Sequence, residues 1–191
     1  ALGGVSPYSC SSFPWNEKRN KPEIVMEGGN VAYHNSLKEI SHSDLSLVTT
    51  SNNLQEPLES FCATSAATGL AIRLAARIKV ENPQLSMLSI RGLMIHSARW
   101  TEEMKRINKI EERMSLCGYG VPNEDIAIYS NEKYATYIFE NQLIPYIKGE
   151  TSNVYGQMHF YDLPWPKELL EEMGSEEVRI RITLSYYVKP S

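Results

Sequence analysis

The chain has 191 residues, 42% of them hydrophobic, which is enough for one sizeable core or for one domain with a smaller appendage. Its formal net charge of −4 provides no basic surface for nucleic acid, and no apolar run reaches the length of a membrane span. We therefore expect neither nucleic acid nor a membrane as a partner.

The N-terminal residues 1–6 contain no basic stretch followed by an apolar one, so no signal peptide is predicted. Because the chain begins without methionine, we expect it to start partway through a longer protein. Cys10, Cys62 and Cys117 are an odd set without metal-binding spacing, which predicts free thiols and favours a reducing, cytoplasmic location. We predict no metal and no cofactor.

The first sixty residues predict mainly loop with short strands. Residues 1–20 are rich in Ser, Pro, Gly and Asn and predict loop. Residues 22–26 predict a short buried strand that ends at Gly28-Gly29, and residues 31–33 extend the strand pattern. Residues 34–60 are polar and predict a long loop with one strand at 45–49, a length typical of functional or mobile loops.

The stretch 59–78 predicts the central helix. Its second half is apolar on nearly every side except at Arg73 and Arg77, which predicts a helix inside the protein with one stripe reaching water. Ser65 then lies at the start of this helix, where free backbone N–H groups favour negative charge. Such a serine can attack a carbonyl while the donors hold the oxyanion. The alternative is that Thr64 and Ser65 only cap the helix.

Two further helices are predicted after the central one. Asn82-Pro83 predicts the start of an amphipathic helix, with an apolar face that includes Met87 and Met94. Thr101 predicts the cap of a third helix, which has a charged solvated face and ends at Gly118 and Gly120.

The pattern changes to β near residue 129. Residues 134–140, 154–161 and 178–188 predict strands, and polar and apolar residues alternate in the last of them as in a half-buried sheet. Residues 167–173 predict one short helix that stops at Gly174. We therefore divide the chain into residues 1–128 and a β-rich appendage at residues 129–191.

The run Ala63-Thr64-Ser65-Ala66-Ala67-Thr68-Gly69 resembles the nucleophile motif of the subtilisin-like serine peptidases, in which Gly-Thr-Ser precedes small residues and a long buried helix. This chain has Ala63 where the family usually has glycine, and Gly69 where many members have proline.

Other stretches resemble the same family in the same order. Residues 8–12 and 21–30 resemble its serine run followed by Lys-Pro-Asp-Val-Val and a glycine. Residues 118–122 resemble the Gly-x-Gly segment that closes the catalytic domain. Residues 95–100 and 182–187 resemble a bacterial branch with an added C-terminal β region.

The resemblance implies the C-terminal portion of an α/β, parallel-sheet domain with a buried nucleophile helix, followed by a small β-rich appendage. It implies a serine endopeptidase in which Ser65 is the catalytic nucleophile. The triad needs aspartate, histidine and serine in that order, and only the serine matches here. In the family, the aspartate, the histidine and the oxyanion asparagine precede the region that corresponds to the first residues of this chain.

We therefore expect this chain by itself to have little or no peptidase activity. The expected partners are a peptide or protein substrate and either the N-terminal part of the same protein or a second copy of the chain. Exposed apolar surface is expected where the missing strands pack.

No histidine is assigned to the triad. His34 and His42 lie in polar loop, where solvated side chains are expected, and His159 lies in the appendage. His96 follows Ile95 on a predicted helix, which favours a hydrogen-bonded structural role. Glu27 is interpreted as a carboxylate that faces water at a strand end.

Two other classes of function were considered. One is a non-catalytic binding or scaffold module in which Ser65 is only a cap, an alternative that Ala63 keeps open. The other is an α/β-hydrolase, which the sequence disfavours because it has no Gly-x-Ser-x-Gly elbow. For Cys62, three residues before Ser65, a small buried apolar role is favoured over a reactive thiol.

Overall fold

The structure is a computed structural model that describes residues 3–11, 21–36, 38–129 and 134–188. The chain divides into two compact units. Unit 1 comprises Ala1–Tyr134 with Thr183–Ser191, and unit 2 comprises Ala135–Ile182. This division does not test whether residues 1–128 are part of a subtilase catalytic domain, which stays a prediction.

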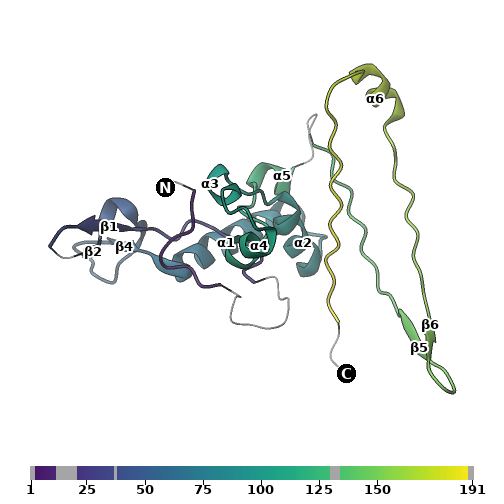
Figure 1. Cartoon of the computed structure of the whole chain (residues 1–191), viewed down its shortest axis with the longest axis horizontal. Coiled ribbons are helices and arrows are strands. Elements are labelled where there is room, and N and C mark those ends of the chain that lie inside the picture. Colours follow the sequence, from purple (N-terminus) through teal and green to yellow (C-terminus); the bar gives the residue numbers. More distant parts are fainter. Residues whose placement is uncertain (1–2, 12–20, 37, 130–133, 189–191) are drawn as a thin grey trace. The chain divides into compact units, whose positions relative to one another are not determined.

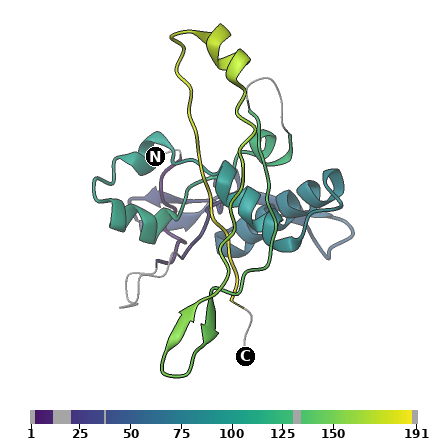
Figure 2. The ribbon, with the colours of Figure 1, turned by 90° about the vertical axis from the view of Figure 1, so that its right-hand side faces the viewer.

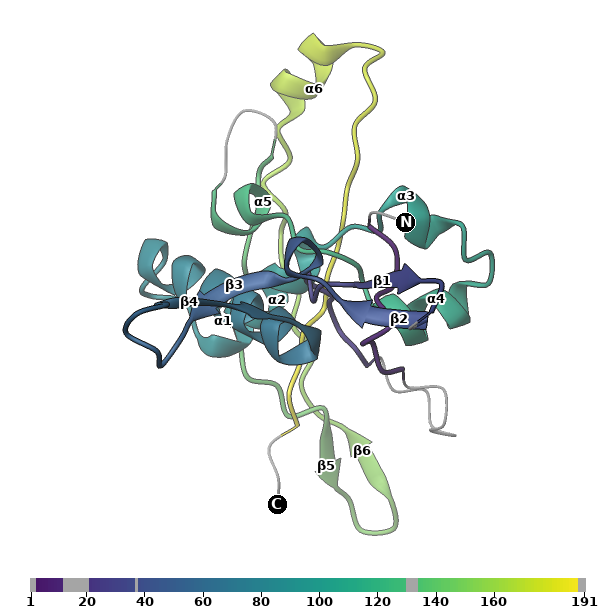
Figure 3. The same cartoon turned by 90° about the vertical axis from the view of Figure 1, so that its left-hand side faces the viewer.

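Unit 1 contains two β-hairpins and the main helices (Figure 1). Strand β1 (Val31–His34) pairs antiparallel with β2 (Lys38–Ser41), and β3 (Leu47–Thr50) pairs antiparallel with β4 (Leu58–Phe61). The 3-10 turn η1 (Ser43–Leu45) separates the two hairpins in sequence. Figure 3 shows the β3–β4 hairpin, whose second strand is followed in the chain by α1.

The helices of unit 1 are α1 (Ala63–Glu81), α2 (Met87–Ser97), α3 (Glu102–Lys105), α4 (Ile110–Cys117) and α5 (Glu124–Ile128). The core lies between α1, α2 and α5, which pack against one another. Its buried members are apolar side chains from these helices and from the α1–α2 connection: Leu74, Ile78, Leu85, Ile90, Leu93, Met94, Ala127 and Ile128. Burial of this apolar surface is the main stabilisation of the unit.

Helix α1 confirms the predicted central helix but not its burial. Only Ala66, Leu74 and Ile78 are buried, and they lie along one face. On the other side, Ile72 is 63% exposed and Val80 is 76% exposed. The prediction of a helix buried on nearly all sides is therefore wrong for the described residues, because α2 and α5 cover one face only.

The later helices begin and end where side-chain caps are available. The helix predicted from Asn82 instead begins at Met87, because Ser86 accepts a hydrogen bond from the Ser89 N–H while Asn82 ends α1. Thr101 caps α3 as predicted. The predicted third helix breaks after Lys105 and resumes at Ile110, and Arg113 donates to the carbonyls of Lys105 and Ile107 at the break.

Two predicted strands of the first half have a different form. Residues 22–26 form no strand, although the Val25 N–H donates to the Gly120 carbonyl and Glu23 accepts from the Tyr119 N–H. The predicted 45–49 strand is present as β3 (Leu47–Thr50), whereas β4 was missed because its residues are all exposed and show no alternation. All strand pairs among the described residues are antiparallel, so the expected parallel sheet is not observed there.

Unit 2 contains β5 (Tyr146–Lys148), β6 (Asn153–Tyr155) and α6 (Lys167–Met173). Figure 2 shows the β5–β6 hairpin and α6 at opposite ends of this unit, joined by extended chain. Helix α6 and its stop at Gly174 are confirmed. Apart from an isolated bridge at Tyr134, the described residues at 134–140 and 178–188 lie in no strand, so the strands predicted there are wrong.

The Gly-x-Gly segment after α4 requires both glycines. Gly118 and Gly120 have φ of 53° and 100°, a region that side chains disfavour. A Cβ on Gly118 would overlap the carbonyls of Pro22 and Glu23, and one on Gly120 would overlap the Arg99 carbonyl. The segment therefore fixes residues 22–25 and Arg99 against the end of α4.

We expect Gly120→Ala to destabilise the protein by about 2 kcal/mol or more, because the methyl group would displace the Arg99 backbone at a strained φ. Urea unfolding measures the change. Gly69→Ala is the matched control: Gly69 lies within α1 with nothing near its added Cβ, so alanine should stabilise by about 0.5–1 kcal/mol. Equal effects of the two substitutions would contradict this account.

Candidate functional site

Ser65 lies in the first turn of α1. The N-cap is Cys62, which makes no side-chain capping bond, so Ser65 is the third helical residue. The capping alternative for Thr64 and Ser65 is therefore wrong. The Ser65 side chain is exposed, and its hydroxyl has no hydrogen-bond partner among the described residues. The structure thus leaves this hydroxyl accessible to solvent.

Gly28 and Gly29 form a close backbone support for the start of α1. The Ala63 N–H donates to the Gly28 carbonyl at 2.7 Å. A Cβ on Gly28 would lie 3.1 Å from the Ala63 carbonyl oxygen. Gly29 has a φ of 78°, and its Cβ would lie 2.8 Å from the Leu45 carbonyl oxygen and 3.1 Å from the Cys62 Cβ. The positive φ and the 2.8 Å approach require glycine at position 29, whereas a side chain at position 28 would be tightly packed against Ala63.

The support is itself fixed by neighbouring backbone. Ser6 donates its hydroxyl hydrogen to the Gly29 carbonyl at 2.7 Å, and the Asn30 N–H donates to the Leu45 carbonyl at 2.8 Å. These bonds connect the N-terminal segment and the η1 turn to Gly29 and Asn30, which follow the Gly28 carbonyl that accepts from Ala63. The position of Ser65 is therefore set by segments distant in sequence.

Ala63 has a φ of 71°, the left-handed region that favours glycine. Among the described residues it is the only non-glycine with positive φ. The subtilisin-like serine peptidases, which this stretch resembles, usually have glycine at this position. The backbone here therefore keeps a conformation suited to glycine while the side chain is alanine.

The start of α1 can stabilise negative charge. The first N–H groups of a helix have no partner within the helix, and the Ala63 N–H is already bonded to Gly28. The N–H groups of Thr64 and Ser65 follow in the same turn, which contains no acidic residue. A carbonyl attacked by the Ser65 hydroxyl would develop its oxyanion near these donors.

The described histidines make no hydrogen bond to Ser65. His42 caps η1, accepting from the Asp44 N–H, and His159 contacts Tyr161 within unit 2. His96 Nδ1 lies 2.9 Å from Thr183 Oγ1, which confirms its predicted hydrogen-bonded role. Burial, with a smaller effect of Arg99, lowers the pKa of His96 below its usual value. The His34 side chain lies outside the described part of the structure.

The remaining titratable candidates are the three cysteines and Glu27. All three cysteines are free, with Cys10 exposed, Cys62 half-buried and Cys117 buried. Burial raises the pKa of the Cys117 thiol, which suits an inert core residue. Glu27 is exposed, as predicted. No group of potential metal ligands is found in the described ranges.

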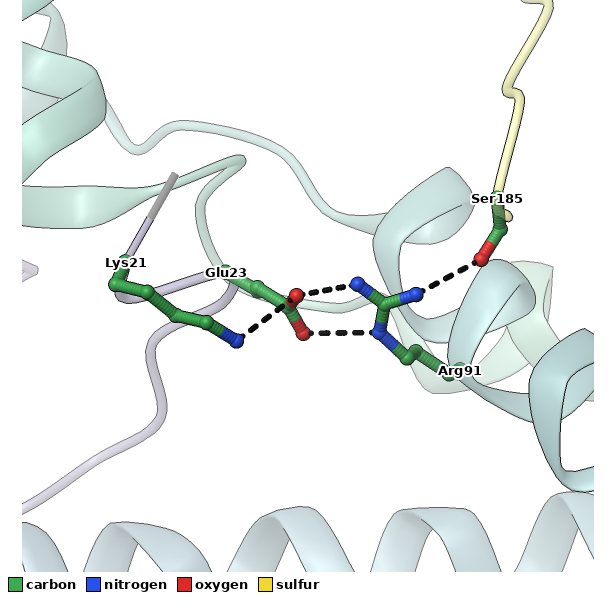
Figure 4. A network of polar contacts seen from close by, with 4 residues as sticks. All are labelled: Lys21, Glu23, Arg91 and Ser185. Atoms are coloured by element: carbon green, nitrogen blue, oxygen red, sulfur yellow. Dashed lines mark hydrogen bonds and ion pairs between the residues drawn. The ribbon is translucent and has the colours of Figure 1, made fainter. Parts of the chain in front are cut away.

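A polar network anchors the segment that leads to Gly28 (Figure 4). Arg91 on α2 donates from Nε to Glu23 Oε2 at 3.1 Å and from Nη2 to Glu23 Oε1. Lys21 Nζ lies 3.0 Å from the same carboxylate, and Arg91 Nη1 donates to Ser185 Oγ at 3.2 Å. The hydrogen bond from Arg91 is the main cause of the lowered pKa of Glu23.

Sequence reasoning missed this network. Glu23 lies in a predicted apolar strand and Arg91 in a predicted amphipathic helix, and neither pattern pairs them. The only available signal was the presence of Arg91 between the apolar residues Ile90 and Leu93.

Comparison with known families now identifies the class of the protein. The family model described as the Subtilase family, peptidase family S8, matches residues 2–121. The chain therefore belongs to the subtilase family, and this membership supports a serine peptidase-like function. A search of curated proteins and a search of solved structures each found no match. Within the described part of the chain, no helix combines the length and apolarity needed to cross a membrane.

We expect Ala63→Gly to stabilise the protein by about 1 kcal/mol, because glycine adopts a φ of 71° without strain. The free energy of unfolding in urea tests this. Ala76→Gly, at an exposed position within the same helix, should instead destabilise by about 1 kcal/mol. A loss of stability in both variants would show that residue 63 is not strained.

We expect Glu23→Gln to destabilise the protein at neutral pH by about 1 kcal/mol, a modest value because solvent screens the partly exposed Arg91. Since folding lowers the Glu23 pKa, its stabilisation is present above the ordinary value of 4.5 and disappears as the pH falls through the lowered value. The difference between wild type and variant should therefore shrink in acid, as measured by urea unfolding across pH.

Glu102→Gln is the matched control, because it removes an exposed ion pair with Lys105 and should change stability less. A difference between wild type and Glu23→Gln that stays constant below the ordinary pKa would contradict the linkage.

Proposed function

We propose that this chain carries the nucleophile segment of a subtilisin-like serine endopeptidase, with Ser65 as the catalytic nucleophile. The observation that supports it is an exposed Ser65 hydroxyl without a described partner, in the first turn of α1 of a subtilase-family chain. The Ser65 oxygen attacks the peptide carbonyl and forms an acyl-enzyme, which water then hydrolyses. The substrate is a peptide or a protein.

The remaining catalytic groups are supplied from outside this chain. The histidine takes the Ser65 proton, the aspartate orients that histidine, and an asparagine joins the backbone donors at the oxyanion. The absence of a hydrogen bond between Ser65 and any described histidine supports this division. The chain by itself therefore has little or no peptidase activity.

The proposed partner is the N-terminal part of the same protein, with a second copy of the chain as the other candidate. Exposed Ile72 and Val80 on α1 support it, because a helix of this composition is normally covered on both sides. The partner would add the parallel strands and complete the burial of α1. In this proposal residues 1–128 are the C-terminal part of the catalytic domain, and residues 129–191 are the β-rich region of a bacterial branch.

A non-catalytic binding or scaffold module is the second candidate. Ala63 favours it, because the nucleophile turn keeps a φ of 71° without the glycine that relieves strain. In this case the chain binds a peptide or protein without cleaving it. For either function, three free cysteines favour a reducing, cytoplasmic location.

A fluorophosphonate probe tests the role of Ser65. We expect very slow labelling of this chain alone, because no base activates the hydroxyl, and rapid stoichiometric labelling at Ser65 in the full-length protein. Mass spectrometry of the labelled peptide locates the site. Ser65→Ala should abolish labelling, whereas Thr68→Ala, one turn further along α1, should leave it unchanged.

Rapid labelling of the isolated chain would overturn the proposed division of the triad. A full-length protein that never labels, although folded, would favour the scaffold.

A further inference from the structure

The C-terminal segment Thr183–Ser185, named the strap below, lies on helix α2 within unit 1. Thr183 shares a hydrogen bond with His96 at 2.9 Å, and Ser185 accepts one from Arg91 at 3.2 Å (Figure 4). Between these two contacts, a Cβ built on Gly92 would lie 3.4 Å from the Ser185 Cβ. The strap therefore contacts α2 through two side-chain hydrogen bonds, and Ser185 lies near Gly92.

The side of the strap that contacts α2 is the polar one. Thr183 and Ser185 are half-buried, whereas Leu184 is 83% exposed and Tyr186 is 71% exposed. Successive side chains of an extended chain point to opposite sides. The polar side of the strap therefore faces α2, whereas the alternating pattern predicted that the side with Leu184 would be buried. Docking of the strap therefore gains little from the hydrophobic effect.

Nor does backbone pairing hold the strap. Residues 183–188 have no backbone–backbone hydrogen bond to another described residue and belong to no strand. The attachment thus rests on two side-chain hydrogen bonds, which water can replace at modest cost.

Detachment would leave the rest of the network in place. Arg91 uses Nε and Nη2 for Glu23 and only Nη1 for Ser185, so the ion pair to Glu23 persists without the strap. The core side chains of α2, including Ile90, Leu93 and Met94, face α1 and α5 rather than the strap. Helix α2 therefore does not depend on the strap for its fold.

From these contacts we propose that the strap is a detachable element that switches between an attached and a released state on a fixed α2. In the attached state, Thr183 occupies His96 Nδ1 and Ser185 occupies Arg91 Nη1. In the released state it exposes both groups together with Gly92 to solvent. The strap is thus a conformational device at the C-terminal end of unit 1, independent of the chemistry proposed for Ser65.

Disulfide trapping tests the attached state. In a background with Cys10→Ser, Cys62→Ala and Cys117→Ala, the pair Gly92→Cys and Ser185→Cys should cross-link on mild oxidation of the full chain. Its Cβ separation of 3.4 Å is close to the usual disulfide range of about 3.5–4.5 Å. The matched control pairs Gly92→Cys with Tyr186→Cys, whose side chain points to solvent, and should cross-link far more slowly.

Thiol labelling tests release. In the same background, Ser185→Cys should react more slowly than Leu184→Cys but much faster than the chain unfolds globally. Adding Thr183→Val should raise the Ser185→Cys rate about fivefold, the effect of losing one side-chain hydrogen bond. Equal rates at 184 and 185, or no selective cross-link, would show that the strap is not attached. A Ser185→Cys rate equal to global unfolding would show that it does not detach.

Discussion

The hydrogen bond from the Ala63 N–H to the Gly28 carbonyl is the constraint on which the candidate site depends. It sets where α1 begins, and thereby places Ser65 in the first turn rather than at a cap. Gly28 and Gly29 favour the bond because they bring bare backbone against Ala63, Cys62 and Leu45. An exposed hydroxyl beside unpaired helix N–H groups is the direct result.

Two sets of contacts hold the segment before Gly28 in place. Gly118 and Gly120 let the end of α4 approach Pro22, Glu23 and Arg99 closely enough for backbone hydrogen bonds. Arg91 on α2, a helix that belongs to the apolar core, forms an ion pair with Glu23. Apolar burial thus provides the stability, while glycines and one ion pair determine where the Gly28 segment lies.

The parts of unit 1 differ in how they are stabilised. Helices α1, α2 and α5 share a buried apolar core, so they form a unit that small changes at the surface do not disturb. The face of α1 that carries Ile72 and Val80 has no such cover among the described residues. The strap at Thr183–Ser185 is attached by polar side chains, in contrast to the apolar contacts that join the helices.

The sequence by itself determined the features that depend on local chemistry. The helix formers within 59–78, the Thr101 cap, the glycines that end α4 and the short helix α6 were predicted because propensity and capping act within a few residues. The ordered motifs also identified the subtilase family, which the match over residues 2–121 confirms.

Only the tertiary structure decided which faces are covered and which polar groups meet. An apolar pattern on α1 could not reveal that one side would remain exposed, since burial depends on what packs there. The alternation at 178–188 predicted a half-buried strand, yet Arg91 and His96 draw Thr183 and Ser185 inward and turn Leu184 outward. Glu23 and Arg91 are separated by 68 positions in the sequence, and Arg91 and Ser185 by 94. Contacts over such separations leave no trace in local periodicity. Their geometry exists only once the core has brought the segments together.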